Sequence, residues 1–249
     1  MKRIELFSCP MDVATGRETV ELIRNRVEAR QFTQHVVVNA AKVVHMQRDI
    51  VLAASIRACD IINIDGMGVV WAARMLGVDV PERVAGVDLF DDLLAMAAEC
   101  GFPVFLLGAT SEVVQATAET IGGRHPRLIV AGYHHGYFWD DEPAIVEKIG
   151  ASGARLLFVA ITSPKKENFI DRWRAQLGVD FVMGVGGTFD VVAGKVRRAP
   201  VWMQRYGLEW LYRVIQEPGR MWRRYLTTNL QFAGLLLKAI LRMPRRQVH

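Results

Sequence analysis

The sequence predicts an α/β fold: a parallel sheet with helices on both faces, followed by a helical, basic C-terminal appendage. Short apolar segments alternate with longer segments of helical character along most of the chain. Apolar residues make up 51% of the 249 residues, which is enough for a sizeable core. The composition changes near Lys195, so we expect an α/β core over residues 1–194 and an appendage over residues 195–249.

Six short apolar segments are expected to form the strands, because polar or turn-forming residues bound each of them. They lie near residues 36–39, 61–65, 104–108, 128–131, 156–161 and 181–184. Segments of helical character lie near residues 15–30, 41–58, 69–76, 89–100, 112–121, 143–151 and 166–177. This alternation is typical of a parallel sheet covered by helices on both faces.

Positive charge is concentrated at the C-terminal end. Residues 195–249 contain 12 Lys and Arg against 2 Asp and Glu, whereas residues 1–194 contain 19 against 24. Such an appendage favours an anionic partner: a phosphate group, a membrane surface or nucleic acid. Aromatic residues lie between the arginines, which is compatible with RNA binding and with a helix at a membrane interface.

Cysteine usage and the N-terminus indicate the cytoplasm. Cys9, Cys59 and Cys100 are far apart and odd in number, which argues against a disulfide framework and a zinc site. The first ten residues lack the apolar core of a signal peptide. The apolar run 230–241 is too short to span a membrane and contains Lys238.

Asp65 is the first candidate for chemistry. It directly follows the apolar segment 61–64 and precedes Gly66 and Gly68, which allow a turn. In an open parallel sheet, ligands bind outside the carboxyl ends of the strands, so this carboxylate is expected to face a crevice. The alternative is that Asp65 caps the following helix.

Further candidates follow other strands. Asn39 is placed to hold a sugar hydroxyl or a phosphate oxygen, or else to cap a helix. Gly108 begins a turn of small residues before a helix, where backbone N–H groups can receive a phosphate. Three glycines among residues 184–187 let a ligand approach the backbone, and Asp190 can then bond a ribose or a base.

Loop and helix-start residues add charge. Arg83 lies in a loop, where it can grip an anion or stay solvated. Asp88 is expected to cap a helix over 89–100. Lys165 and Lys166 stand at a helix start, where positive charge is unfavourable, so they are expected to face an anion.

Metal binding is not expected. His134 and His135 are adjacent on an aromatic loop that includes Tyr137, and no further ligands appear at standard spacing. The chain has no Asp-x-Asp motif, and Asp91-Asp92 and Asp140-Asp141 are interpreted as acids at helix starts.

With these residues in hand, the sequence resembles the WecG/TagA/CpsF glycosyltransferases, family 26, over nearly the whole chain. The resemblance is carried by Asp65-Gly66-x-Gly68, Arg83-x-x-Gly86-x-Asp88-Leu89, Pro164-Lys165-x-Glu167, Gly184-Val185-Gly186-x-x-Phe189-Asp190, Ala193-Gly194, Arg198-Ala199-Pro200, Glu209-Trp210-x-x-Arg213 and Glu217-Pro218-x-Arg220-x-x-Arg223-Arg224-Tyr225. It implies a Rossmann-like enzyme at the cytoplasmic face of the inner membrane that moves a hexose from a UDP-sugar to an undecaprenyl-diphosphate-linked acceptor.

The resemblance also implies roles for residues. Asp65 resembles the catalytic base. The UDP-sugar site would comprise Asn39, Arg83, Asp88, Gly108, Tyr137, Lys166, Val185, Gly186 and Asp190. The lipid diphosphate would meet Arg198, Arg213, Arg220 and Arg223. Lys166 replaces a glutamine that the family usually carries in this motif, which affects the donor contact expected there.

The donor is expected to be UDP-glucose, because Asn39 is followed by alanine where members associated with N-acetylmannosamine often carry proline. UDP-N-acetylmannosamine or its uronate is the alternative donor. The expected reaction inverts the anomeric centre without a metal or other cofactor. A homo-oligomer is compatible with the sequence. An RNA-binding α/β module and a Rossmann dehydrogenase are the competing classes, although the first strand lacks the dehydrogenase G-x-G-x-x-G motif.

Overall fold

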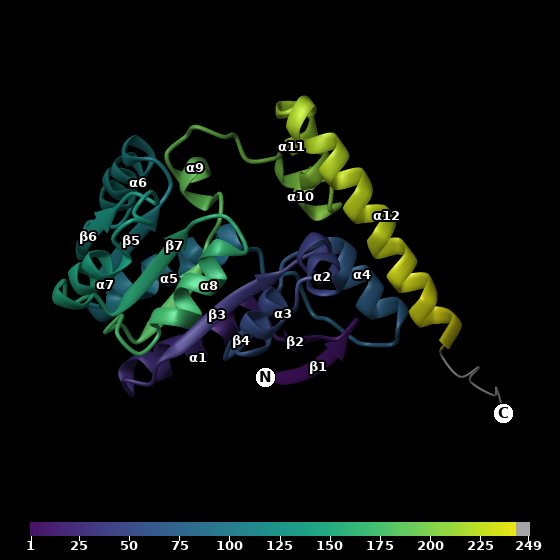
Figure 1. The fold of residues 1–249 in the computed structure, drawn as a ribbon, viewed down its shortest axis with the longest axis horizontal. Helices are drawn as coiled ribbons and strands as arrows, with labels where there is room; N and C mark the ends of the chain where they lie inside the picture. The colour runs from purple at the N-terminus through teal and green to yellow at the C-terminus, as the bar shows by residue number, and fades with distance from the viewer. Residues whose placement is uncertain (243–249) are drawn as a thin grey trace.

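The computed structural model describes residues 1–242, with the side chains of Arg220, Met221 and Arg224 excepted. Its centre is a sheet with the strand order β1-β2-β4-β3-β8-β7-β5-β6 (Figure 1). The strands are β1 (Lys2–Leu6), β2 (Cys9–Val13), β3 (Thr33–Val38), β4 (Ile61–Ile64), β5 (Val104–Gly108), β6 (Val130–His134), β7 (Leu156–Ala160) and β8 (Phe181–Gly184). All neighbouring strands are parallel except β1 and β2, which are antiparallel.

Helices cover both faces of this sheet, which confirms the predicted Rossmann-like fold. Successive side chains of a strand point to opposite faces of the sheet, and each hydrophobic cluster combines strand residues of one face with the apolar residues of the helices that cover it. The clusters therefore show which helices lie on which face. The first face carries α1 (Gly16–Glu28), α5 (Gly86–Cys100), α6 (Ser111–Arg124) and α9 (Thr188–Val192). The second face carries α2 (Ala40–Met46), α3 (Ile50–Arg57), α4 (Met67–Met75), α7 (Glu142–Ala151) and α8 (Lys165–Trp173).

Three local features differ from expectation. The β1–β2 hairpin is unexpected, because Lys2, Arg3 and Glu5 give this edge strand a charged pattern. The helix expected over 41–58 is two helices, since Asp49 accepts a hydrogen bond from Leu52 N–H and starts α3 anew. Asp88 is not a cap, because α5 begins at Gly86 and places Asp88 inside its first turn.

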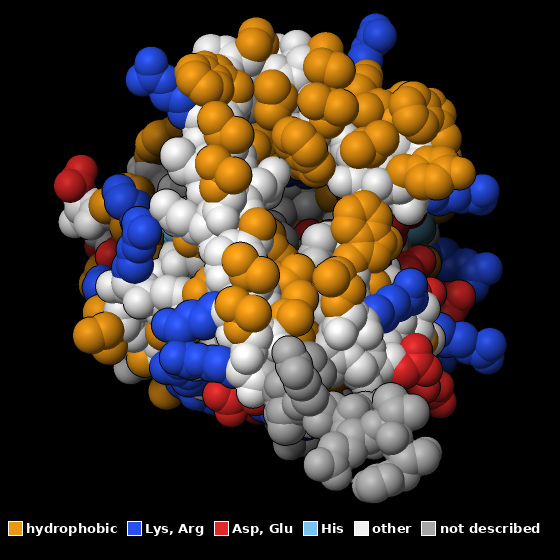
Figure 2. Space-filling view, turned by 90° about the vertical axis from the view of Figure 1, so that its right-hand side faces the viewer, with side chains coloured by type: hydrophobic (Ala, Val, Ile, Leu, Met, Phe, Trp, Pro, Cys, Tyr) orange, Lys and Arg blue, Asp and Glu red, His pale blue; other side chains and the backbone are white. Residues whose placement is uncertain are grey.

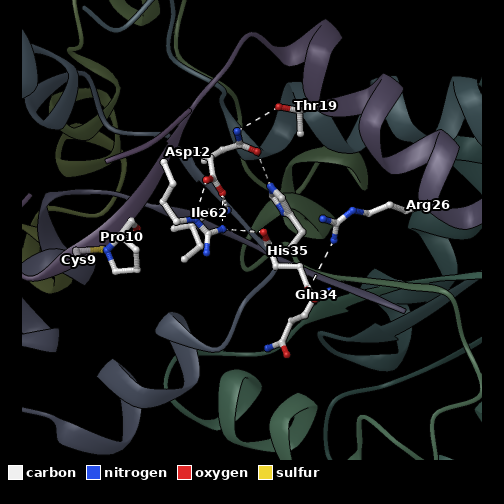
Figure 3. Close-up of polar contacts among 11 residues, drawn as sticks. Cys9, Pro10, Asp12, Thr19, Arg26, Gln34, His35 and Ile62 are labelled. Carbon is white, nitrogen blue, oxygen red and sulfur yellow. Dashed lines mark hydrogen bonds and ion pairs between the residues drawn. The ribbon is translucent and has the colours of Figure 1, made fainter. Parts of the chain in front are cut away.

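Buried polar residues tie the N-terminal strands to α1 (Figure 3). Asp12 accepts two hydrogen bonds of 2.8 Å from Arg3 and one from the Ile62 N–H. His35 Nε2 lies 2.8 Å from Asn63 Oδ1, and Asn63 Nδ2 donates to Thr19 Oγ1. Burial lowers the pKa of His35 to about 4, so the imidazole is neutral at pH 7. Because Asn63 Oδ1 can only accept a hydrogen bond, the proton of the ring lies on Nε2.

The appendage forms α10 (Val201–Arg205), α11 (Glu209–Gln216) and α12 (Pro218–Arg242). Pro218 is the first residue of the last helix, a position that suits proline because its missing N–H would be unpaired there. This helix packs along α2 (Figure 1), where Phe232 is buried with its ring 5.4 Å from that of Phe7. Within residues 1–242, no helix combines the length and the apolar character needed to cross a membrane.

Candidate active site

A crevice is expected where neighbouring strands send their following helices to opposite faces of the sheet. The strands β3 and β8 are such neighbours, because α2 follows β3 on the second face and α9 follows β8 on the first. Asn39 directly follows β3, while Val185 and Gly186 directly follow β8. The topology therefore brings three of the predicted donor-binding residues to the two sides of one switch point.

Asp65 lies beside this switch point, at the carboxyl end of β4. Its N–H donates to the carbonyl of Val38, the last residue of β3, over 2.9 Å. A Cβ at Gly66 would lie 3.2 Å from Asn39 Cα, so the glycine lets the two turns approach each other. The cap alternative for Asp65 is wrong, because Gly66 is the N-cap of α4 and no side chain caps that helix.

The segment before α5 brings Arg83 to the same edge. Val84 N–H donates to the carbonyl of Ile64 over 2.9 Å, so this segment runs beside the end of β4. The Gly86 N–H lies near enough to the Asp65 carboxylate to favour its charged form. Arg83 is half-buried and lies within electrostatic range of Asp65.

Burial raises the pKa of Asp65, and the charges around it partly oppose one another. Arg83 and Arg213 favour the carboxylate, whereas Glu209 disfavours it. A half-buried carboxylate with a raised pKa at the end of a strand is suited to accepting a proton at neutral pH.

An ion-pair chain connects the core to the appendage. Arg83 Nη1 donates to Glu209 Oε2, and Glu209 Oε1 lies 3.7 Å from Arg198 Nε. The other two nitrogens of Arg198 donate to Asp88, with Nη2 and Oδ2 2.7 Å apart. The resemblance places Asp88 in the UDP-sugar site and Arg198 at the lipid diphosphate, but in this structure the two side chains bind each other.

A pocket of about 120 Å³ opens between α9 and the appendage. Asp190, Arg198 and Arg213 line it, together with Arg197 and Glu209. Gly187 lines it too, and the preceding Gly186 has a φ of 55°, a left-handed conformation that favours glycine. Asp190 and the glycine-rich loop therefore face the appendage across this pocket.

Lys166 belongs to a buried charged cluster on the second face. Its methylene groups cover Gly184, where an added Cβ would lie 2.5 Å from Lys166 Cδ. Lys42 Nζ and Lys166 Nζ lie 3.1 and 3.4 Å from the same oxygen of Glu167. Burial and the charge of Lys42 lower the pKa of Lys166 to about 8. The sequence predicts that Lys166 faces an anion, and in the structure this anion is Glu167. Because Lys42 and Lys166 share this one carboxylate, the cluster keeps a net positive charge.

Of the predicted site residues that the structure describes, Asp190, Arg198 and Arg213 line the pocket beside α9, whereas Asp65 and the others do not. Gly108 is explained by packing, because its φ is 128° and an added Cβ would lie 2.4 Å from the Ala160 carbonyl oxygen. Tyr137 is exposed on the loop after β6. Arg223 is exposed on α12 with its guanidinium 5.4 Å from the Trp222 ring centre. The side chain of Arg220 lies outside the described residues.

Asn39 is a helix cap, which was one of the two interpretations of its position. Its Oδ1 accepts a hydrogen bond of 3.0 Å from Lys42 N–H and so caps α2. The residue is exposed, and its contact with the sugar donor stays a prediction. Sequence reasoning gave no role to Glu209, Lys42 or Arg197. Glu209 belongs to the motif Glu209-Trp210-x-x-Arg213. Its role was missed because its partner Arg83 is 126 residues away in the chain.

No three His, Cys, Asp or Glu side chains within the described part of the chain are grouped so that they could hold a metal ion. The reaction's independence of metal remains a prediction.

Comparisons with known proteins identify the family. Residues 4–246 match the glycosyl transferase WecG/TagA/CpsF family. Two relatives carry the name N-acetylglucosaminyldiphosphoundecaprenol N-acetyl-beta-D-mannosaminyltransferase. The one from Bacillus spizizenii is 38% identical over 174 residues, which cover 70% of this chain and 67% of the relative. The one from Bacillus subtilis is 37% identical over 163 residues, which cover 66% of this chain and 63% of the relative.

The chain thus aligns with about two thirds of the length of these relatives. Their name fits the alternative donor, N-acetylmannosamine, better than the glucose donor favoured from the sequence. The match over nearly the whole chain, together with the predicted fold, settles the class: this protein belongs to the WecG/TagA/CpsF family of glycosyl transferases.

Proposed function

We propose that this protein transfers an N-acetylmannosaminyl group from its UDP-sugar to an acceptor sugar linked to a polyprenyl diphosphate. The names of the two relatives support this donor and this class of acceptor. Family membership favours a glycosyltransferase over the RNA-binding module and the dehydrogenase. The observation that carries the proposal is the position of Asp65, half-buried at the carboxyl end of β4 and beside both the crevice and the appendage.

Asp65 acts as the general base in this proposal. It takes the proton from the acceptor hydroxyl while that oxygen forms a bond to the anomeric carbon of the donor sugar. The bond between the anomeric carbon and the diphosphate breaks in the same displacement, and UDP leaves from the opposite side. The configuration at the anomeric carbon is therefore inverted.

The departing UDP carries negative charge that the protein must stabilise. Arg83 and Arg213 lie near Asp65, and Lys166 contributes net positive charge behind the crevice. The glycine-rich loop after β8 lets phosphate oxygens approach the backbone closely. We assign the stabilisation to these groups without a metal ion.

The appendage would hold the enzyme against an anionic membrane. Hydrophobic side chains gather at the top of the face in Figure 2, the level at which Figure 1 places α10, α11 and the start of α12. Trp202, Tyr206, Ile215 and Trp222 are among the exposed apolar residues there. Lys and Arg side chains lie at the edges of this face. Apolar rings beside arginines match the depth and charge of a headgroup layer.

A donor screen tests the proposal. The full chain is incubated with a synthetic polyprenyl-diphosphate N-acetylglucosamine, and released UDP is measured with UDP-N-acetylmannosamine, its uronate, UDP-glucose and UDP-N-acetylglucosamine. We expect acceptor-dependent release with UDP-N-acetylmannosamine and at least 10-fold less with UDP-glucose, the discrimination that a few lost polar contacts provide. Release from UDP-glucose alone would restore the donor expected from the sequence.

The same assay tests the metal assignment. Excess EDTA should leave the rate of UDP release unchanged, because cationic side chains carry the charge of the leaving group. Loss of activity with EDTA and recovery on adding Mg²⁺ or Mn²⁺ would overturn the metal-free mechanism.

A further inference from the structure

Glu209 joins two arginines that come from different parts of the molecule. Arg83 belongs to the core segment beside β4, and Arg198 belongs to the start of the appendage. Their side chains meet at the two oxygens of one carboxylate, because Arg83 Nη1 donates to Oε2 and Arg198 Nε lies 3.7 Å from Oε1. Two guanidinium groups that converge on one small anion are a typical phosphate-binding arrangement.

In the part of the chain that the structure describes, the Glu209 carboxylate leaves a nitrogen of these two guanidinium groups without a hydrogen bond. Arg198 Nε is shielded from solvent and makes no hydrogen bond within the described residues, since 3.7 Å exceeds hydrogen-bonding distance. Asp88 takes one N–H from each of the other two nitrogens of this guanidinium, so Nε is the nitrogen without a hydrogen-bond partner among residues 1–242 and can donate to a further anion. A phosphoryl group is larger than a carboxylate and presents three oxygens, so it can reach both arginines.

We propose that Arg83 and Arg198 form a single site for a phosphoryl group and that Glu209 occupies this site in the unliganded enzyme. The inference rests on the proposed function, which supplies two sources of the ligand: the diphosphate of the donor and the diphosphate of the acceptor. A phosphoryl group bound there would lie next to Asp65, because Arg83 is an electrostatic neighbour of that carboxylate.

Displacement of Glu209 also has a structural consequence. Glu209 is the first residue of α11, and this helix carries Trp210 and the pocket-lining Arg213. A ligand that takes the place of Glu209 therefore releases one of the ties between the appendage and the core.

Binding of inorganic pyrophosphate, UDP and farnesyl diphosphate to the full chain tests the site. Glu209→Gln removes the competing charge and keeps the shape of the side chain. If Glu209 occupies the site in about nine-tenths of the unliganded molecules, the apparent affinity for a ligand is about 10-fold lower than that of the open site. Glu209→Gln should therefore bind pyrophosphate about 10-fold more tightly than the wild type. Adding Arg198→Ala to this variant should reverse the gain.

Glu82→Gln is the matched control. Glu82 precedes Arg83 in the same segment, but its carboxylate accepts a hydrogen bond from the Gly16 N–H. This variant changes the net charge equally and should leave pyrophosphate affinity within about 2-fold of wild type. If Glu209→Gln does not fold, Glu209→Asp keeps the charge, withdraws it by one methylene and should give a smaller gain.

The other two ligands identify the source. Tighter binding of UDP assigns the site to the donor, and tighter binding of farnesyl diphosphate assigns it to the acceptor. Unchanged or weaker binding of all three ligands by the Glu209 variants would overturn the inference. Because these are binding measurements, they stand apart from the donor screen, and a failure to transfer sugar would leave their result intact.

Discussion

The core and the appendage of this protein use apolar residues in opposite ways. In the core, every residue of β4, β7 and β8 is buried. In the appendage, α11 buries none of its residues. The large apolar side chains of Trp202, Tyr206 and Ile215 are 57–68% exposed. The core is therefore stabilised by its own packing, whereas much of the apolar surface of the appendage is available to another surface.

Charge follows the same division. Arg198 of the appendage, which lines the pocket, binds Asp88 of the core. Glu209 makes the reverse contact, because this acidic residue of the appendage binds Arg83 of the core. The two regions thus join through charged contacts next to Asp65, and the site depends on both.

Phe232 is a large apolar side chain of the appendage that is buried like those of the core, so we expect its removal to have the largest effect on stability. This side chain is buried against Phe7 and joins the apolar cluster of β1–β4. Phe232→Ala should lower the free energy of unfolding by about 3–5 kcal/mol, the range for a buried phenylalanine. Urea unfolding followed by circular dichroism measures this.

The matched control lies two residues away on the same helix. Leu230 is 65% exposed, so Leu230→Ala should change the free energy of unfolding by less than about 0.5 kcal/mol. Equal effects of the two substitutions would show that α12 is not anchored through Phe232.

The buried polar contacts of the core predict a pH dependence of stability. His35 has a pKa of about 4 in the folded protein and about 6.5 when unfolded, so the unfolded state binds more protons between these values. The contribution is complete above pH 6.5 and is lost as the pH falls towards 4, by about 3 kcal/mol in total.

Urea unfolding of the wild type and of His35→Gln at pH 7.5 and pH 4.5 isolates this contribution. The wild type should lose about 2.5 kcal/mol more than the variant between the two values, most of the total, because pH 4.5 is still above the folded pKa. The same loss in both proteins would assign the pH dependence to other groups.

The exposed face of the appendage predicts a smaller effect, on membrane binding. Replacing Trp202, Tyr206 and Ile215 with serine should weaken binding to vesicles rich in anionic lipid by about 10-fold or more. Co-sedimentation with vesicles measures this. Ile50→Ser is the control, because Ile50 is 84% exposed on α3, outside the appendage, and should not affect binding. Equal binding by all three proteins would leave the appendage without this role.

The sequence predicted β4, β5, β7 and β8 to within one residue, because these strands are short apolar runs buried on both faces. It placed β3 at 36–39 instead of Thr33–Val38 and β6 at 128–131 instead of Val130–His134. It missed the β1–β2 hairpin, whose alternation is short and interrupted by charge. It merged α2 and α3, since the break at Asp49 contains neither glycine nor proline. Elements with weak local signals are thus fixed by tertiary packing.

The candidate site shows the same limit. Asp65 could be proposed as a candidate from the sequence, because it directly follows an apolar strand segment and precedes glycines that allow a turn. The pairing of Arg83 with Glu209 has none, since the two residues meet only after the chain has folded. The roles of Asp88 and Arg198 toward a ligand likewise depend on their contact with each other, which spans 110 residues.

The central claim is that Asp65 removes the proton from the acceptor. Asp65→Asn keeps the size and shape of the side chain and one oxygen that can accept a hydrogen bond, so the variant should fold and bind UDP like the wild type. The direct test is the rate of sugar transfer by this variant at saturating donor and acceptor, with UDP affinity measured in parallel. The account predicts a loss of about 10²–10⁴ in rate with UDP affinity retained, and a near-normal transfer rate would contradict it.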